Sequence, residues 1–252
     1  MKHPKWIALA VGVGLLFLFS ARSENFIDMS NLMEIDELLD DDEGSNRGSI
    51  ADPLEGLNRT IFGINNFVYK TLLRPFTHQY VLVVPKEARR AVGNFFVNLE
   101  YPVRFTGSIL QLKIGHATKE TGKFLINSTV GIGGLIDVTK EDPTFDLPEE
   151  DIGQAFGSWG INHGFYIVLP FLGPSSLRGF AGRLGGNTVD PLSEPWTQVD
   201  DTHERLLLQG TDTINDLPEI IDLFYSITNS AIDPYAAVRN GYTQYRANQV
   251  KE

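Results

Sequence analysis

The stretch Asp52-Pro53-Leu54-Glu55-Gly56-Leu57-Asn58-Arg59-Thr60-Ile61-Phe62 is the part of the sequence that says most about the fold. It has the form of a helix start. Asp52 is typical of a residue that caps free backbone N–H groups, Pro53 suits the first helical position, and Glu55 can reach back toward the cap. Apolar residues then recur at helical spacing, which predicts an amphipathic helix over residues 53–71.

The sequence beyond this helix is also read as mostly helical. Arg74-Pro75 is expected to end the first helix. Further helices are predicted over residues 85–100, 102–112, 116–128, 149–160, 175–184, 202–210, 218–228 and 233–247. The run Phe165–Pro174 is continuously apolar and too short to span a membrane. We interpret it either as a buried strand or core segment, or as one limb of a hydrophobic hairpin. The predicted fold class is all-α.

The composition excludes several classes of protein. Hydrophobic residues make up 42% of the 252 residues and charged residues 21%, which fits neither a disordered chain nor one with many membrane spans. A chain of this length can bury one sizeable core. The absence of cysteine excludes disulfides, thiolate metal sites and cysteine nucleophiles.

The N-terminal segment predicts export. Lys2 and Lys5 precede the apolar run Trp6–Phe19, and a small-residue pattern ends at Ser23. This order is typical of a secretory signal peptide, and the run is short for a membrane-spanning helix, which needs about 17–25 residues. We therefore expect residues 1–23 to be a cleaved signal peptide or a retained anchor.

An acidic segment follows, over residues 24–51. It holds nine acidic residues against one arginine, so its charge is −8, and the whole chain carries −11. We interpret it as a disordered linker between the membrane and a domain over residues 52–245, with a tail over 246–252. The regular ligand spacing of a calcium loop is absent. The negative charge argues against a nucleic-acid partner.

Several motifs resemble those of the MlaA (VacJ) family, and they occur in the expected order. The opening signature comprises Asp52, Pro53, Glu55, Asn58 and Arg59. Later segments are Arg74-Pro75, Asn94-Phe95, Asn98-Leu99-Glu100 with Pro102, Phe124–Ser128, Gly131-Ile132-Gly133-Gly134-Leu135-Ile136-Asp137, Gly153–Gly160, Leu169–Arg178 and Asp233-Pro234-Tyr235. Together these segments cover about residues 52–245.

The resemblance implies a ring of amphipathic helices around a central polar channel, embedded in the periplasmic leaflet of the bacterial outer membrane. Members of the family remove mislocalised phospholipids from the outer leaflet. They sit beside outer-membrane porin trimers and pass lipid to a soluble periplasmic carrier. The implied function is transport that maintains lipid asymmetry, without catalysis and without a cofactor.

Candidate site residues follow from the resemblance and from residue type. In the family, a glycine-containing loop lines the channel, and here the loop contains Gly160, Asn162, His163 and Gly164. We expect these residues to gate the channel. Asn65 and Asn66 are candidates for channel-facing polar groups.

The glycine-rich segment 131–137 has two interpretations. Glycine-rich loops can cradle phosphate, but such loops follow a buried strand and precede a helix with a lysine or a well-placed acid, and none is evident here. We expect instead a tight turn at a membrane-facing helix, packed at the rim of the channel.

Two features depart from the family pattern. Members carry a lipidated cysteine after the signal segment, and this chain has none. The loop that has a Gly-x-Gly-x-Gly/Pro character in the family reads Gly160-Ile161-Asn162-His163-Gly164-Phe165 here. The first departure concerns anchoring, and the second concerns loop mobility, since Asn162 tolerates positive φ but Phe165 is less pre-set than proline.

Two other functions compete with transport. An enzyme could use Ser158, Ser175 or Ser176 as nucleophile with His163 as base, but the spacing of a nucleophile elbow is absent. The histidines also lack metal-ligand spacing, so no metal site is predicted. The second alternative is an envelope scaffold that binds a porin or another outer-membrane partner without moving lipid. The sequence leaves this scaffold alternative open.

Overall fold

The structure is a computed structural model that describes residues 50–251 apart from 194, 198 and 200. The expected signal peptide or anchor, and the linker up to residue 49, lie outside the described residues. The last two linker residues belong to the fold instead. Ile50 is buried in the main core, and Ala51 forms a parallel bridge with Phe165. The folded region therefore begins earlier than residue 52.

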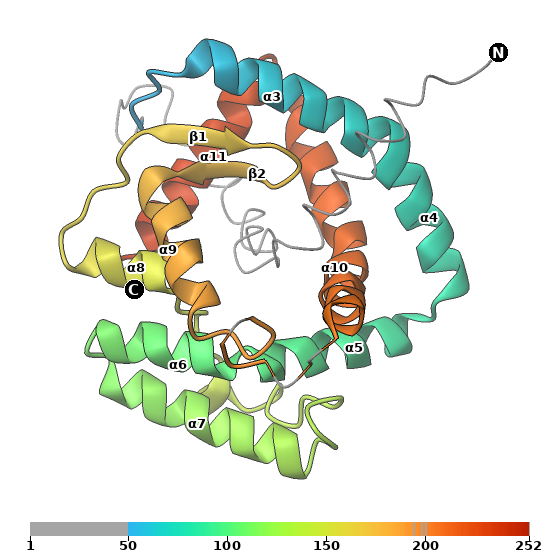
Figure 1. The fold of residues 1–252 in the computed structure, drawn as a ribbon, viewed down its shortest axis with the longest axis vertical. Coiled ribbons are helices and arrows are strands. Elements are labelled where there is room, and N and C mark those ends of the chain that lie inside the picture. The colour runs from blue at the N-terminus through green and yellow to red at the C-terminus, as the bar shows by residue number, and fades with distance from the viewer. Residues whose placement is uncertain (1–49, 194, 198, 200, 252) are drawn as a thin grey trace.

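The described chain is mostly helical, which confirms the predicted fold class. Its helices follow one another around a ring, with a two-stranded hairpin along one side (Figure 1). In chain order the elements are α3 (Glu55–Val68), η2 (Tyr69–Leu73), α4 (Arg74–Val83), α5 (Lys86–Leu99), α6 (Tyr101–Leu110), α7 (Ile114–Thr129), η3 (Pro143–Phe145), α8 (Ile152–Ser158), β1 (Tyr166–Leu169), β2 (Gly173–Ser176), α9 (Leu177–Asn187), α10 (Thr202–Ser230) and α11 (Pro234–Gln249).

The first helix does not end at Arg74-Pro75 as predicted. It passes through η2, a single π-helical turn, and continues as α4 with the proline in the first turn. Proline lacks an N–H group and crowds the carbonyl of the preceding turn of an α-helix. A wider π-helical turn lies just before Pro75. The helix therefore contains this proline and still continues along the ring without a break (Figure 1).

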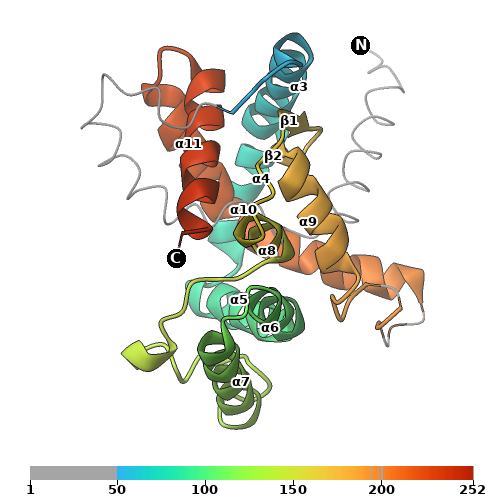
Figure 2. The same ribbon diagram turned by 90° about the vertical axis from the view of Figure 1, so that its left-hand side faces the viewer.

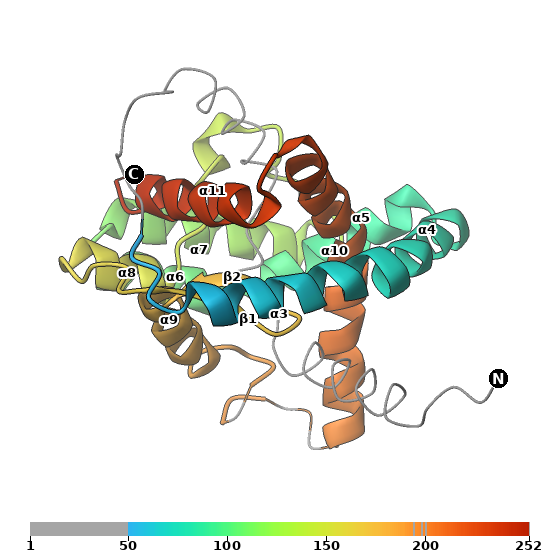
Figure 3. The same cartoon turned by 90° about the horizontal axis from the view of Figure 1, so that it is seen from above.

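The C-terminal helices also differ from their predicted bounds. The two helices expected over 202–210 and 218–228 form one helix, α10, with Pro218 inside it. The N-terminal part of α10 projects away from the ring (Figure 3). The predicted tail over 246–252 is wrong at its start, because α11 runs to Gln249 and Arg246 is 4% exposed.

The apolar run at 165–174 forms most of an antiparallel hairpin. Tyr166 pairs with Ser176 and Leu169 pairs with Gly173. The turn between the strands places Phe171 at φ 64° and Gly173 at φ 80°. Each of the two interpretations therefore describes part of this segment: it contains the strand β1, and this strand is one limb of a hairpin.

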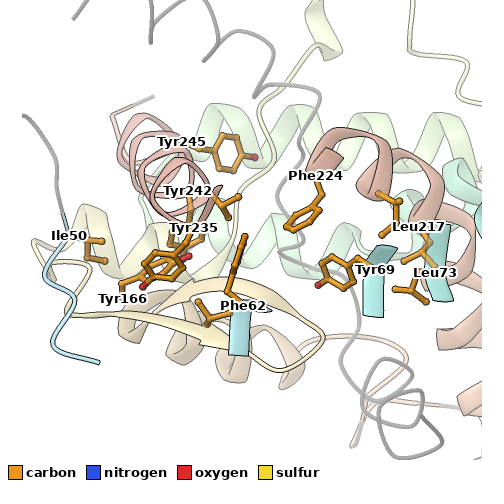
Figure 4. Close-up of a cluster of buried hydrophobic side chains, with 13 residues drawn as sticks. Ile50, Phe62, Tyr69, Leu73, Tyr166, Leu217, Phe224, Tyr235, Tyr242 and Tyr245 are labelled. Carbon is orange, nitrogen blue, oxygen red and sulfur yellow. The ribbon is translucent and has the colours of Figure 1, made fainter. Parts of the chain in front are cut away.

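The main core lies where α3, the hairpin, α10 and α11 meet (Figure 4). It is rich in aromatic rings that pack edge to face. The ring centroids of Phe62 and Tyr235 are 5.7 Å apart, and those of Tyr69 and Phe224 are 5.0 Å apart. The first contact joins α3 to α11 and the second joins η2 to α10, and together they close the ring. The elements α5, α6 and α7 lie at the opposite end from this core (Figure 2).

Candidate functional site

Large apolar side chains are exposed on most elements of the ring. On α3, the buried face includes Asn58 and Asn65, whereas Leu57, Ile64 and Phe67 lie on the other side and are exposed. Exposed apolar side chains elsewhere include Leu72, Phe76, Val81, Leu82, Val83, Leu125, Val130, Ile132, Ile136, Trp159, Ile161, Phe180, Leu184 and Leu207. Extensive apolar exposure of this kind marks membrane or protein contact.

The length and the apolar character of a helix decide whether it could cross a membrane. Within residues 50–251, setting aside the three undescribed positions, no helix is both long and apolar enough to cross a membrane.

Polar side chains inside the ring hold the hairpin to α3. The amide of Asn58 donates to the Tyr166 carbonyl at 3.0 Å and accepts from the Val168 N–H at 2.9 Å. Asn65, two turns later on α3, donates to the Leu169 carbonyl at 2.9 Å and accepts from the Phe171 N–H at 2.8 Å. The two amides act as a neighbouring strand would, by satisfying the backbone of β1 and the turn after it.

This arrangement corrects the expectation for Asn65. The side chain is 1% exposed and bonds the hairpin, so it is a structural contact and not a channel-facing group. The adjacent Asn66 is half-buried, and its Oδ1 atom has no hydrogen-bond partner among the described residues. A channel-facing role for Asn66 stays a prediction. The signal for Asn65 lay in its seven-residue spacing from Asn58, which places both on one helix face.

Residues of the opening signature hold α3 and α11 together, and we call this set of contacts the latch. The predicted cap is wrong, because no side chain caps α3. The Asp52 carboxylate accepts instead from Asn58 at 2.8 Å, from the Tyr235 hydroxyl, and from Arg239 at 3.3 Å. Tyr235 and Arg239 lie on α11, more than 180 residues from Asp52 in the sequence, so local sequence rules could not reveal these two contacts.

The second half of the latch joins Arg59 to the start of α11. Arg59 binds Glu55 at 2.8 Å and both oxygens of Asp233 at 3.1 and 2.7 Å. Glu55 therefore pairs with Arg59 and does not reach back to the cap. Asp233, where the last helix was predicted to begin, caps α11, and the hydrogen bond from Arg59 lowers its pKa to about 2. The signature residues thus close the ring.

The glycine-rich segment is a tight turn after α7, as expected. Gly133 and Gly134 have φ 70° and 92°, and a Cβ atom on Gly134 would lie 2.6 Å from the Cβ of Asn98 on α5. A Cβ on Gly131 would lie 2.2 Å from the Ile136 carbonyl oxygen. Asp137, the last residue of the glycine-rich segment, accepts hydrogen bonds from Asn127 and Thr139. The segment follows α7 in the sequence and packs against α5. Its place at a channel rim stays a prediction.

The loop of residues 159–165, between α8 and β1, contains the four predicted gating residues. Gly160 and Gly164 both have positive φ, at 85° and 72°. A Cβ on Gly160 would meet nothing within 4 Å. Asn162 is exposed, whereas His163 is half-buried with its Nδ1 atom enclosed. The loop therefore has two glycine joints and an open surface around the first of them.

Contacts with the start of α9 define the inner side of this loop. The backbone N–H of Arg178 donates to the His163 carbonyl at 3.1 Å, and its Nη1 donates to the Ile161 carbonyl at 3.1 Å. Burial, followed by the positive charges of Arg178 and Arg246, lowers the pKa of His163 to about 4. His163 is therefore neutral at physiological pH.

The serines proposed as alternative nucleophiles have structural partners. Ser176 accepts from the Gly179 N–H as the cap of α9 and accepts from the Tyr242 hydroxyl. Ser175 and Ser158 donate to nearby backbone carbonyls. Each of the three serines therefore takes part in a local hydrogen bond of the fold.

Sequence reasoning missed the buried charges beside the loop. Asp151, the cap of α8, accepts from both terminal nitrogens of Arg246 at 2.6 and 3.1 Å. Burial alone would raise the pKa of Asp151, but the charge and hydrogen bonds of Arg246 outweigh burial and lower it. Arg178 is 6% exposed beside this pair. Isolated charged residues in a sequence read as surface residues, so no local pattern marked them.

Comparisons with known proteins agree with this geometry. A family model described as "MlaA lipoprotein" matches residues 50–249. The chain is 30% identical over 204 residues to the "Intermembrane phospholipid transport system lipoprotein MlaA" of Escherichia coli K12, covering 80% of this chain and 79% of that one. The protein of the same name from Haemophilus influenzae is 27% identical over 196 residues, covering 77% and 76%.

A solved structure is similar as well. It is described as "Structural basis for maintenance of bacterial outer membrane lipid asymmetry", and the match has a TM-score of 0.66 at 28% identity. The match covers 79% of this chain and 99% of the other.

Proposed function

The chain belongs to the MlaA lipoprotein family, and from this premise we propose that it removes mislocalised phospholipids from the outer leaflet of the bacterial outer membrane. In this proposal the lipid passes through a polar channel within the ring and reaches a soluble periplasmic carrier. The names of its relatives support the coarser function of intermembrane phospholipid transport. The finer route is our own inference.

The observation that carries the proposal is the distribution of side chains over the ring. Apolar side chains such as Phe67, Leu82 and Leu184 are exposed on helices that follow one another around the ring (Figure 1). A lipid headgroup crosses hydrocarbon slowly, because each unpaired polar group costs several kcal/mol there. The apolar exterior would keep the helices among the acyl chains, and the proposed polar channel would let the headgroup stay solvated while the tails remain in lipid.

The proposed location is the periplasmic leaflet of the outer membrane, beside a porin trimer. The exposed apolar residues would contact acyl chains or the porin. Attachment through a lipidated cysteine is not available to these 252 residues, since they contain none. We therefore assign anchoring to the N-terminal apolar segment, if it is retained, and to the embedded helices.

The proposed gate is the loop of residues 159–165. Gly160 and Gly164 supply two joints, and Asn162 is exposed between them. An alanine at position 160 meets no atom within 4 Å but strains the backbone at φ 85° by about 1–2 kcal/mol. An alanine at Gly56 of α3 also meets nothing, and that glycine has an ordinary helical φ, so it provides a matched control.

Lipid movement in vesicles separates transport from the scaffold alternative. The purified chain is inserted into vesicles with a fluorescent phospholipid in both leaflets, and a membrane-impermeant quencher is added. Transport predicts that fluorescence falls below half, while a scaffold leaves it at half, as in protein-free vesicles. Gly160→Ala is expected to alter the rate and Gly56→Ala to leave it unchanged. Equal rates for the two variants would contradict a gating role for the loop.

A further inference from the structure

Arg178 occupies an unusual position between α8 and α9. Glycines allow these helices to approach closely, since a Cβ on Gly182 would lie 2.4 Å from the Cα of Gly153. Arg178 lies in the first turn of α9, and a Cβ on Gly157 would lie 2.7 Å from its Nη1 atom. The guanidinium therefore rests against the backbone of α8, at the end where the 159–165 loop begins.

Only one side of the Arg178 guanidinium is used. Nη1 donates to the Ile161 carbonyl, whereas Nε and Nη2 are buried and have no hydrogen-bond partner among the described residues. Nε and Nη2 form one edge of the planar group and donate in parallel. This edge matches the spacing of two oxygens of a carboxylate or phosphate.

No carboxylate of the described residues forms an ion pair with Arg178. Asp151 is occupied by Arg246, which binds both of its oxygens. Burial, followed by the charge of Arg246, lowers the pKa of Arg178, whereas Tyr242 and Asp151 act in the opposite direction. A buried, unpaired charge is costly to a fold and points to an anionic partner.

The backbone donors of the α9 N-terminus are already engaged. The N–H groups of Leu177, Arg178 and Gly179 bond to Phe165, His163 and Ser176. Within the described part of the chain, the donors left free here are Nε and Nη2 of Arg178, and the buried Nδ1 of His163 also has no partner there. Two of these backbone bonds and the Nη1 bond end on the loop, so Arg178 and the start of α9 hold the loop in its position.

We propose that the Nε–Nη2 edge of Arg178 binds the phosphate group of a phospholipid, reached when the 159–165 loop moves. This inference rests on the proposed function and names the chemical group that is recognised. Because Arg178 also bonds Ile161, one side chain would contact both the loop and the lipid. Loop position and lipid binding would then depend on each other.

Binding to the purified full chain in detergent tests the proposal. The probes are dihexanoyl phosphatidylglycerol, inorganic phosphate and dihexanoylglycerol, which has no phosphate. Arg178→Gln and Arg178→Lys are expected to weaken binding of the phosphatidylglycerol at least tenfold, since lysine keeps the charge but lacks the paired donors. Arg90→Gln, at an exposed arginine of α5, is the matched control and should bind as the unaltered chain does.

The three probes separate the sources of the phosphate. Stronger binding of phosphatidylglycerol than of inorganic phosphate supports a lipid headgroup. Equal affinity for both probes contradicts the lipid assignment in favour of free phosphate, and equal binding of dihexanoylglycerol overturns the phosphate site. Unchanged binding by Arg178→Gln, in protein with an unaltered circular dichroism spectrum, also overturns it.

A measurement on the unaltered chain covers the case in which the variants fail to fold. A bound phosphate brings negative charge near His163, so saturating lipid is expected to raise the pKa of this imidazole, measured by NMR, from about 4. An unchanged pKa at saturation would overturn the proposal. Normal phosphate binding by a chain that moves no lipid in vesicles would refute the proposed function and leave the site standing.

Discussion

Replacing Asn65 by alanine is expected to lower the free energy of unfolding by about 3 kcal/mol. The Asn65 side chain is 1% exposed and makes two hydrogen bonds of 2.9 and 2.8 Å to the hairpin backbone. Each buried hydrogen bond contributes about 1 kcal/mol, and leaving a partly buried backbone group unpaired costs about 1–3 kcal/mol. For a chain of this size, the loss corresponds to a fall in Tm of about 6–12 °C.

The adjacent residue provides a matched control for this prediction. Asn66→Ala removes the same atoms from the same helix, but the Oδ1 atom of Asn66 has no partner among the described residues. Its effect should lie within about 0.5 kcal/mol. Thermal unfolding in detergent, followed by circular dichroism, measures both variants. Equal losses for the two would refute the idea that Asn65 holds the hairpin.

Two further predictions concern the glycine-rich turn and the buried ion pair. Gly134→Ala should cost about 2–5 kcal/mol, because it combines positive φ with a Cβ 2.6 Å from Asn98, whereas Gly133→Ala has open space and should cost about 1–2 kcal/mol. Denaturant unfolding compares the two, and equal costs would contradict the close packing. Asp151→Asn should cost about 3–5 kcal/mol at pH 7, because it removes the carboxylate that forms an ion pair with the buried Arg246. The pKa of Asp151 is lowered in the folded chain, so its stabilisation is present above the ordinary pKa of about 4 and is lost as pH falls below it. Thermal unfolding at pH 7 and pH 3 should therefore show a smaller difference between Asp151→Asn and the unaltered chain at pH 3, and a constant difference would contradict the assignment.

The sequence predicted the elements that depend on local spacing. The helix around Leu57 and Ile64 follows from apolar residues at helical intervals, and the cap of α11 follows from Asp233-Pro234. Local rules failed at Pro75, where a π-helical turn precedes the proline and the helix continues, and between residues 210 and 218, where α10 is one continuous helix.

Long-range partners explain what the sequence could not reveal about the site. Asp52 looks like a helix cap, but its carboxylate bonds Tyr235 and Arg239 from the other end of the chain. Arg178 ends one of the segments that resemble the family, but nothing in the sequence shows that close packing of glycines on α8 and α9 buries it. In each case the role of the residue depends on which helices pack together, and the spacing of residues along the sequence does not reveal this packing.

The amount of phospholipid in the outer leaflet of intact cells tests the central claim most directly. It is measured with a lipid-modifying enzyme that reaches only the cell surface, in cells with and without the gene. Removal of phospholipid predicts a rise on deletion that the intact chain reverses. An unchanged surface level on deletion would contradict the account and favour the scaffold alternative.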